Sequence, residues 1–167
     1  MQTVTDARNE LFGTLFPGGV PRLWCPLLTH YRDNGTIDTD RIAAHIAHMR
    51  PSVSAFLAPG STGDGWEMTS DETDELLSFL VDEAGRQEFS LMVGVLRTEP
   101  GSVVPAIRAV LQRFAYERAD AASLAENRIS GFTVTPPKGA ELTQEIIQAE
   151  LEAIAKTGVP IAVYQLP

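Results

Sequence analysis

Short apolar runs alternate with longer segments of helical periodicity along most of the chain. The apolar runs hold four to seven residues each, and most of them show no regular alternation with polar residues. Runs of this length and pattern are typical of strands buried on both faces of a sheet. The predicted strands are Arg22–Leu28, Val53–Ala58, Leu91–Leu96, Phe132–Thr135 and Ile161–Tyr164.

Each segment between two predicted strands carries a helix start signal and an apolar stripe. Thr69 and Glu72 form a capping-box pattern, which satisfies free N–H groups at the start of a helix, and Gly85 is expected to end that helix. Residues 118–128 are rich in alanine and charge, and we interpret them as the tail of the third helix plus a loop. The other predicted helices begin near Thr39, Ser102 and Thr143.

The predicted order βαβαβαβαβ indicates a parallel sheet with right-handed crossovers. It fits an open doubly wound sheet or the first five strands and four helices of a (β/α)8 TIM barrel, which needs about 250 residues when complete. The last strand has no helix after it to cover it, so we expect a chain cut short. Residues 1–19 are expected to form a helical lead, and residues 20–167 the N-terminal part of a single barrel domain.

Charge and composition limit the classes of partner that the chain is expected to bind. The 167 residues include 22 Asp and Glu against 13 Lys and Arg, a net charge of -9 that disfavours binding to nucleic acid or to an anionic membrane. No apolar run approaches the roughly 18 residues of a membrane span, and the start of the chain lacks the features of a signal peptide. We therefore expect a cytoplasmic protein.

The glycine-rich segment between the second predicted strand and the Thr69 capping box is the strongest candidate for chemistry. It reads Gly60-Ser61-Thr62-Gly63-Asp64-Gly65. Glycines let a backbone approach a ligand closely, and adjacent hydroxyls can bind a carboxylate. The alternative is a strand-to-helix turn whose hydroxyls bond to their own backbone. The pattern matches neither the P-loop nor the dinucleotide fingerprint.

Four segments in order resemble the dihydrodipicolinate synthase / N-acetylneuraminate lyase family, from about Val20 to Pro167. They are Gly35-Thr36-Ile37-Asp38, Gly60–Gly65, Thr133-Val134-Thr135-Pro136-Pro137 and Val163-Tyr164-Gln165-Leu166-Pro167. The resemblance implies the TIM barrel rather than the doubly wound sheet. It also implies a lyase or aldolase that acts on pyruvate or another 2-oxo acid through a lysine Schiff base, without a cofactor.

The same resemblance assigns roles to residues. Ser61 and Thr62, with Gly60 and Gly63, would bind the carboxylate of the 2-oxo acid and relay protons. Tyr164, at the end of the fifth strand, would be the proton-transferring phenol. The Schiff-base lysine of the family lies on the sixth strand, beyond residue 167, so the 167 residues alone are expected to be inactive. Family members are commonly tetramers, and a dimer or tetramer of identical chains is expected here.

Lys138 departs from the family pattern. It stands where dihydrodipicolinate synthases usually have a tyrosine of the proton relay, and it is one of only two lysines in the chain. One hypothesis makes Lys138 a substrate-binding cation, and another makes it the nucleophile of a complete small enzyme. The alternatives are a solvated loop lysine and a non-catalytic half barrel that binds a small carboxylate or a partner chain.

Three histidines, His30, His45 and His48, precede the glycine-rich segment. A zinc site needs three or four converging ligands. The helical periodicity places His45 beside the apolar stripe and His48 farther out, so we predict no metal site.

Overall fold

The computed structural model describes residues 3–16, 19–115 and 121–164 as a five-stranded parallel sheet with helices between the strands. The strands are β1 (Cys25–Pro26), β2 (Ala55–Ala58), β3 (Ser90–Val95), β4 (Ile129–Val134) and β5 (Ile161–Val163). The helices are α1 (Val4–Leu15), α2 (Thr39–Met49), α3 (Ser70–Gln87), α4 (Val103–Phe114), α5 (Ala121–Glu126) and α6 (Gln144–Ala155), with a 3-10 turn at Ser61–Gly63.

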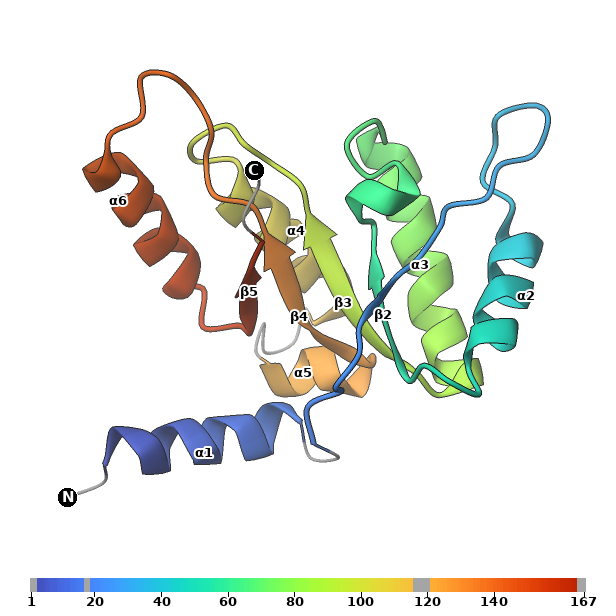
Figure 1. Cartoon of the computed structure of the whole chain (residues 1–167), viewed down its shortest axis with the longest axis horizontal. Helices are drawn as coiled ribbons and strands as arrows, with labels where there is room; N and C mark the ends of the chain where they lie inside the picture. The colour runs from blue at the N-terminus through green and yellow to red at the C-terminus, as the bar shows by residue number, and fades with distance from the viewer. Residues whose placement is uncertain (1–2, 17–18, 116–120, 165–167) are drawn as a thin grey trace.

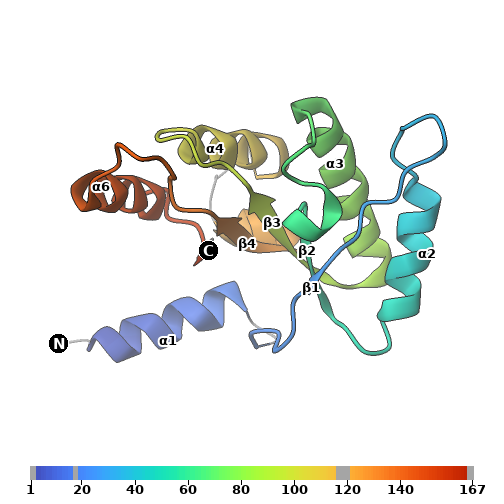
Figure 2. The ribbon, with the colours of Figure 1, turned by 45° about the horizontal axis from the view of Figure 1, so that its top comes forward.

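Strand order settles the choice between the two architectures. The strands pair in the order β1-β2-β3-β4-β5, each parallel to the one before it in sequence. Helices α2, α3, α4 and α6 lie in an arc on one face of the sheet (Figures 1 and 2). A doubly wound sheet reverses its strand order and carries helices on both faces. The fold is therefore a partial TIM barrel, as predicted.

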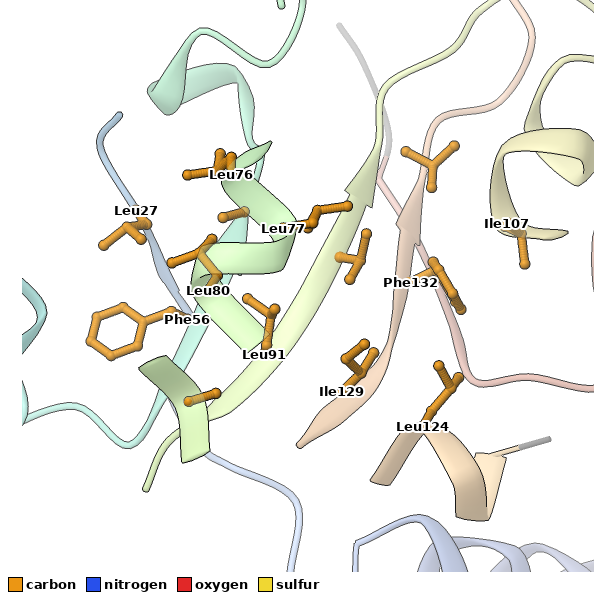
Figure 3. Packing of buried hydrophobic residues seen from close by; sticks show 14 of the residues in the cluster. Leu27, Phe56, Leu76, Leu77, Leu80, Leu91, Ile107, Leu124, Ile129 and Phe132 are labelled. Carbon is orange, nitrogen blue, oxygen red and sulfur yellow. The ribbon is translucent and has the colours of Figure 1, made fainter. Parts of the chain in front are cut away.

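The main core lies between the sheet and the arc of helices. Side chains from the strands and from the helices contribute to this core, and its largest members are completely buried (Figure 3). Leu76, Leu77 and Leu80 of α3 form one stripe that packs against this core, as the helical period predicts. The strand residues Phe56, Leu91 and Phe132 lie on the same, helix-covered face.

Helix starts follow the predicted capping chemistry with one correction. Thr69 and Glu72 form the expected capping box, and Thr143 accepts a hydrogen bond from the N–H of Ile146 at 3.4 Å. The cap of α2 is Asp38 rather than Thr39, because the Asp38 carboxylate accepts from the Arg41 N–H at 3.1 Å. Thr39 is the first helical residue.

Helix α3 runs past Gly85, where the sequence predicted its end. It continues to Gln87 and stops at Glu88, which adopts a left-handed conformation with φ 57°. Gln87 explains the extension, because its side-chain amide donates to the carbonyl of Ala43 in α2 at 3.1 Å. A tertiary contact therefore outweighs the local preference for a glycine stop.

Two further elements differ from the sequence prediction. Only Cys25 and Pro26 of the predicted strand 22–28 pair with β2. The interpreted tail and loop at 118–128 contain the separate helix α5, which packs against β4 and completely buries Leu124 (Figure 3). Six residues are too few for a helical period to stand out in the sequence, so α5 was missed.

Helix α1 lies in the N-terminal lead. Thr3 and Asp6 form a capping box at the start of α1. The helix lies on the side of the sheet opposite to the arc of helices (Figure 2). Among the described residues, no helix is long and apolar enough to cross a membrane.

Candidate active site

A small cavity opens where the strands end, at the edge that carries the loops leading into the helices. In barrels of this kind, catalytic residues lie on the loops at the carboxyl ends of the strands. The cavity has a volume of about 80 Å³, and its lining residues come from all five strands or the loops that follow them. They are Pro26, Leu57, Gly60, Ser61, Thr62, Leu96, Thr133 and Tyr164.

Four residues predicted for the site therefore meet at one place. Gly60, Ser61 and Thr62 lie in the turn after β2, and Tyr164 lies more than 100 residues later, directly after β5. Parallel pairing brings these distant segments to the same edge of the sheet. The roles that the sequence resemblance gives these residues stay predictions.

The glycine turn is fixed by its own backbone and by the loop after β1. The N–H groups of Gly63 and Gly65 both donate to the carbonyl of Gly60, at 3.0 and 2.9 Å. The Thr29 hydroxyl donates to the carbonyl of Gly63 at 2.7 Å. A Cβ atom on Gly63 would lie 2.4 Å from the carbonyl oxygen of Leu27, so only glycine fits at this contact.

The two hydroxyls of the turn face open space. Ser61 and Thr62 are exposed, whereas Gly60 and Gly63 on either side are buried. Neither hydroxyl has a hydrogen-bond partner in the part of the chain that the structure describes. This corrects the alternative of hydroxyls bonded to their own backbone, because both hydroxyls are available to a ligand.

Tyr164 is held by its backbone. Its N–H donates to the carbonyl of Val134 at 2.7 Å, which extends the β4–β5 pairing to the cavity. The side chain is 45% exposed. The phenol is therefore positioned at the cavity and accessible to solvent.

Thr133 is a further lining residue of the cavity, which belongs to the Thr133–Pro137 motif but was not predicted for the site. It is 6% exposed, and its neighbours Phe132 and Val134 belong to the helix-covered core. The alternation of side chains along β4 places Thr133 on the other face, toward the cavity. A polar residue between two apolar ones in a buried strand was the signal available in the sequence.

Lys138 and Gly63 do not line the cavity. Gly63 serves the turn through the contacts described above. Lys138 is exposed, and its backbone N–H donates to the carbonyl of Thr98 at 2.9 Å, which joins the loops after β3 and β4. The described residues contain no group of three or more His, Cys, Asp or Glu side chains that could hold a metal ion.

Tyr31 lies beside the acidic end of the glycine turn. Burial raises the pKa of its phenol, and the negative charges of Asp64, Glu72 and Glu67 raise it further. Asp64 itself adopts a left-handed conformation with φ 59°, which aspartate tolerates better than most residues. The Tyr31 hydroxyl therefore stays protonated at neutral pH and can donate a hydrogen bond.

Comparison with known proteins relates this fold to one group of enzymes. No protein-family model matches the chain, and no curated protein matches its sequence. Among solved structures, dihydrodipicolinate synthase from Aquifex aeolicus matches 89% of this chain and 46% of its own, with a TM-score of 0.69 and 19% identity.

Two further solved structures show the same relation. The 2-keto 3-deoxygluconate aldolase from Picrophilus torridus matches 86% of this chain and 47% of its own, with a TM-score of 0.67 and 20% identity. A prophage protein of the dihydrodipicolinic acid synthase family from E. coli K12, solved in complex with pyruvate, has a TM-score of 0.70 and 17% identity, over 88% of this chain and 45% of its own.

The fold that the sequence resemblance implied is therefore confirmed. The chain has the fold of the N-terminal portion of dihydrodipicolinate-synthase-like barrels, and it spans about half the length of these solved structures.

Proposed function

We propose that the cavity binds the carboxylate of pyruvate or another 2-oxo acid through the hydroxyls of Ser61 and Thr62. The observation that carries this proposal is the pair of unpartnered hydroxyls on a rigid turn, at the edge where barrel enzymes bind substrates. Hydroxyl groups donate to a carboxylate, and a turn fixed before binding loses little conformational entropy. The pyruvate complex of the E. coli prophage protein with this fold supports the choice of ligand.

Tyr164, which lines the same cavity as Thr133, would transfer protons there. A general acid or base must reach the reacting group, and the exposure of Tyr164 leaves its phenol free to do so. In the proposed lyase or aldolase reaction, a lysine amine condenses with the keto carbon and releases water. The resulting iminium stabilises a carbanion at the neighbouring carbon, so that a carbon–carbon bond can form or break.

The lysine of this reaction would lie beyond residue 167. Neither lysine of the sequence is a lining residue of the cavity, since Lys138 sits in the loop after β4 and Lys156 follows α6. We therefore expect residues 1–167 alone to bind a 2-oxo acid without catalysing its cleavage or condensation. The homo-oligomer and the cytoplasmic location stay predictions.

A second candidate function is a module that binds a small carboxylate without any covalent step. The hydroxyls of Ser61 and Thr62, which have no partner among the described residues, would hold the carboxylate in this case too. The two candidates share the same binding site and differ only in the source of the nucleophile.

Isothermal titration of the 167-residue chain with pyruvate tests the binding site. We expect measurable binding that weakens by at least about tenfold in Thr62→Val, since a lost hydrogen bond to a charged group is worth about 1.5–3 kcal/mol. Thr5→Val in α1 is the matched control and should bind as the parent chain does. Equal affinity in the two variants would overturn the proposed site.

Borohydride reduction with pyruvate, followed by intact mass, tests the covalent step. We expect no reduced adduct on the 167-residue chain. An adduct that disappears in Lys138→Arg would show instead that Lys138 is the nucleophile. An adduct confined to a longer chain would support a lysine beyond residue 167.

A further inference from the structure

Two histidines form a direct contact outside the cavity. His30 lies in the loop after β1, and His45 lies on α2. The Nε2 atom of His30 is 3.2 Å from the Nδ1 atom of His45, a hydrogen-bond distance, and the rings meet edge to face. Both side chains are half-buried. The contact therefore joins the loop to the helix at a site that the proposed function does not use.

The same loop holds the glycine turn. Thr29, directly before His30, donates its hydroxyl to the carbonyl of Gly63, and the backbone at Leu27 packs closely against the same glycine. On the other side of His30, Tyr31 forms an antiparallel bridge with Ile37. Any movement of His30 away from α2 therefore acts on the residue that fixes the turn of Ser61 and Thr62.

A hydrogen bond between two imidazoles depends on their protons. When both rings are neutral, or when only one of them is protonated, one ring still offers a lone pair to the N–H of the other. With both rings protonated, neither contacting nitrogen can accept, and two positive charges face each other across 3.2 Å. The contact therefore exists only while at least one ring is neutral.

The surroundings do not compensate for a second positive charge. The charged groups on the loop are Arg32, Asp33 and Asp38, and those on α2 are Asp40 and Arg41. Those on the neighbouring α3 are Asp71, Glu72, Asp74, Glu75, Asp82, Glu83 and Arg86. None of their carboxylates forms an ion pair with His30 or His45 among the described residues; Asp38 caps α2, and Glu83 pairs with Arg86 at 2.9 Å. The remaining titratable neighbours are His48 on α2 and Tyr31, which faces the carboxylates of the glycine turn.

Burial and the charges of His30 and His48 lower the pKa of His45 below its ordinary value. The folded chain thus binds this proton less readily than the unfolded chain does. The stability that the neutral pair contributes is present above about pH 6.5 and is lost as the pH falls below it.

We propose that the His30–His45 contact is a pH-sensitive positioning device, which fixes the loop after β1 and, through Thr29, the turn that carries Ser61 and Thr62. When both rings are protonated, the contact between them breaks and this turn loosens. The structural part of the inference stands on the contacts alone, and only its effect on ligand affinity rests on the proposed function.

Nuclear magnetic resonance tests the device without any ligand. We expect the ring of His45 to titrate below about pH 6.5 and the backbone amides of Thr62 and Gly63 to shift with the same midpoint. In His45→Gln and in His30→Gln, each of which leaves one imidazole of the pair, that midpoint should vanish from both amides. His48→Gln is the matched control: the ring of His45 and both amides should still titrate together, with the midpoint raised because the charge of His48 is gone. Thr29→Val should keep the titration of His45 but uncouple it from the turn.

Pyruvate titration then links the device to the site. In the parent chain and in His48→Gln, the dissociation constant should rise at least about threefold between about pH 7.5 and pH 5, and in His45→Gln the rise should be absent. If the pH-dependent amide shifts at Thr62 and Gly63 persist unchanged in both His30→Gln and His45→Gln, the proposal is wrong. If pyruvate binds at neither pH while the amide shifts depend on His45, the proposed function fails and the device remains.

Discussion

The two faces of the sheet are built differently, although they share the same strands. On the helix-covered face, residues such as Phe56, Leu91 and Phe132 are completely buried under α2, α3, α4 and α6. The opposite face carries, at its carboxyl edge, the small cavity to which Ser61, Thr62 and Tyr164 contribute. At its amino edge it carries a larger apolar groove of about 410 Å³, bordered by Phe12 and Phe16 next to Met92 and Ile161.

This difference separates stability from chemistry. The helix-covered face supplies the apolar burial that drives folding. The carboxyl edge of the opposite face exposes hydroxyls and a phenol that a packed core would exclude. One strand serves both purposes through alternate residues, so adjacent substitutions should have different effects.

The largest expected effect comes from adjacent residues of β4. Phe132→Ala should lower the free energy of unfolding by about 3–5 kcal/mol, because it leaves a cavity in the core. Thr133→Ala should lower it by about 1 kcal/mol or less and should weaken pyruvate binding instead. Urea unfolding and titration measure the two quantities. Equal loss of stability in both variants would contradict the division between the faces.

The second largest effect is expected from a substitution of Gly63 in the glycine turn. Gly63→Ala places a Cβ atom 2.4 Å from the carbonyl oxygen of Leu27, so the turn must shift. We expect a loss of about 1–3 kcal/mol in unfolding free energy, together with weaker pyruvate binding. Gly85→Ala in α3 is the control, since its Cβ meets nothing within 4 Å, and it should stabilise by about 0.5–1 kcal/mol. A Gly63 variant as stable as the parent chain would show that the turn is not rigid.

The start of α3 connects the two regions, because its cap lies next to the glycine turn and its apolar stripe enters the core. Thr69→Ala should lower the free energy of unfolding by about 1 kcal/mol through loss of the cap. Because the loss is confined to the start of the helix, the affinity of the folded chain for pyruvate should stay unchanged. A large loss of affinity would mean that the cap also positions the turn.

The smallest effect concerns pH. Hydrogen bonds from the backbone and side chain of Thr69 lower the pKa of Glu72. Its contribution to stability is therefore present above the unfolded pKa and is lost as the pH falls through the folded pKa. The free energies of unfolding of the parent chain and of Glu72→Gln, measured between about pH 6 and pH 3, should converge at the acid end. Parallel curves would contradict the capping role of the carboxylate.

Local patterns in the sequence predicted much of this fold. The capping box at Thr69 and Glu72 and the leucine stripe of α3 depend only on residues within a few turns of one another, so a linear sequence contains them. The glycine-rich segment and the strand end at Tyr164 were also visible as motifs. Their resemblance to one enzyme family pointed to the barrel before strand order was known.

Other features depended on contacts between distant segments. The Gln87–Ala43 bond extends α3 past Gly85, and docking onto β4 makes a helix of a six-residue segment. The placement of Thr133 beside Tyr164, and of His30 against His45, follows from strand pairing and helix packing. No local pattern shows which residues of segments far apart in the chain will meet.

The sequence by itself therefore determined most of the secondary structure and the chemistry available, since both depend largely on short-range backbone preferences and residue type. The tertiary structure decided which of those groups meet. It brought Ser61, Thr62 and Tyr164 to one cavity and kept Lys138 outside it. The physical reason is that parallel pairing aligns the ends of strands that lie far apart in the chain.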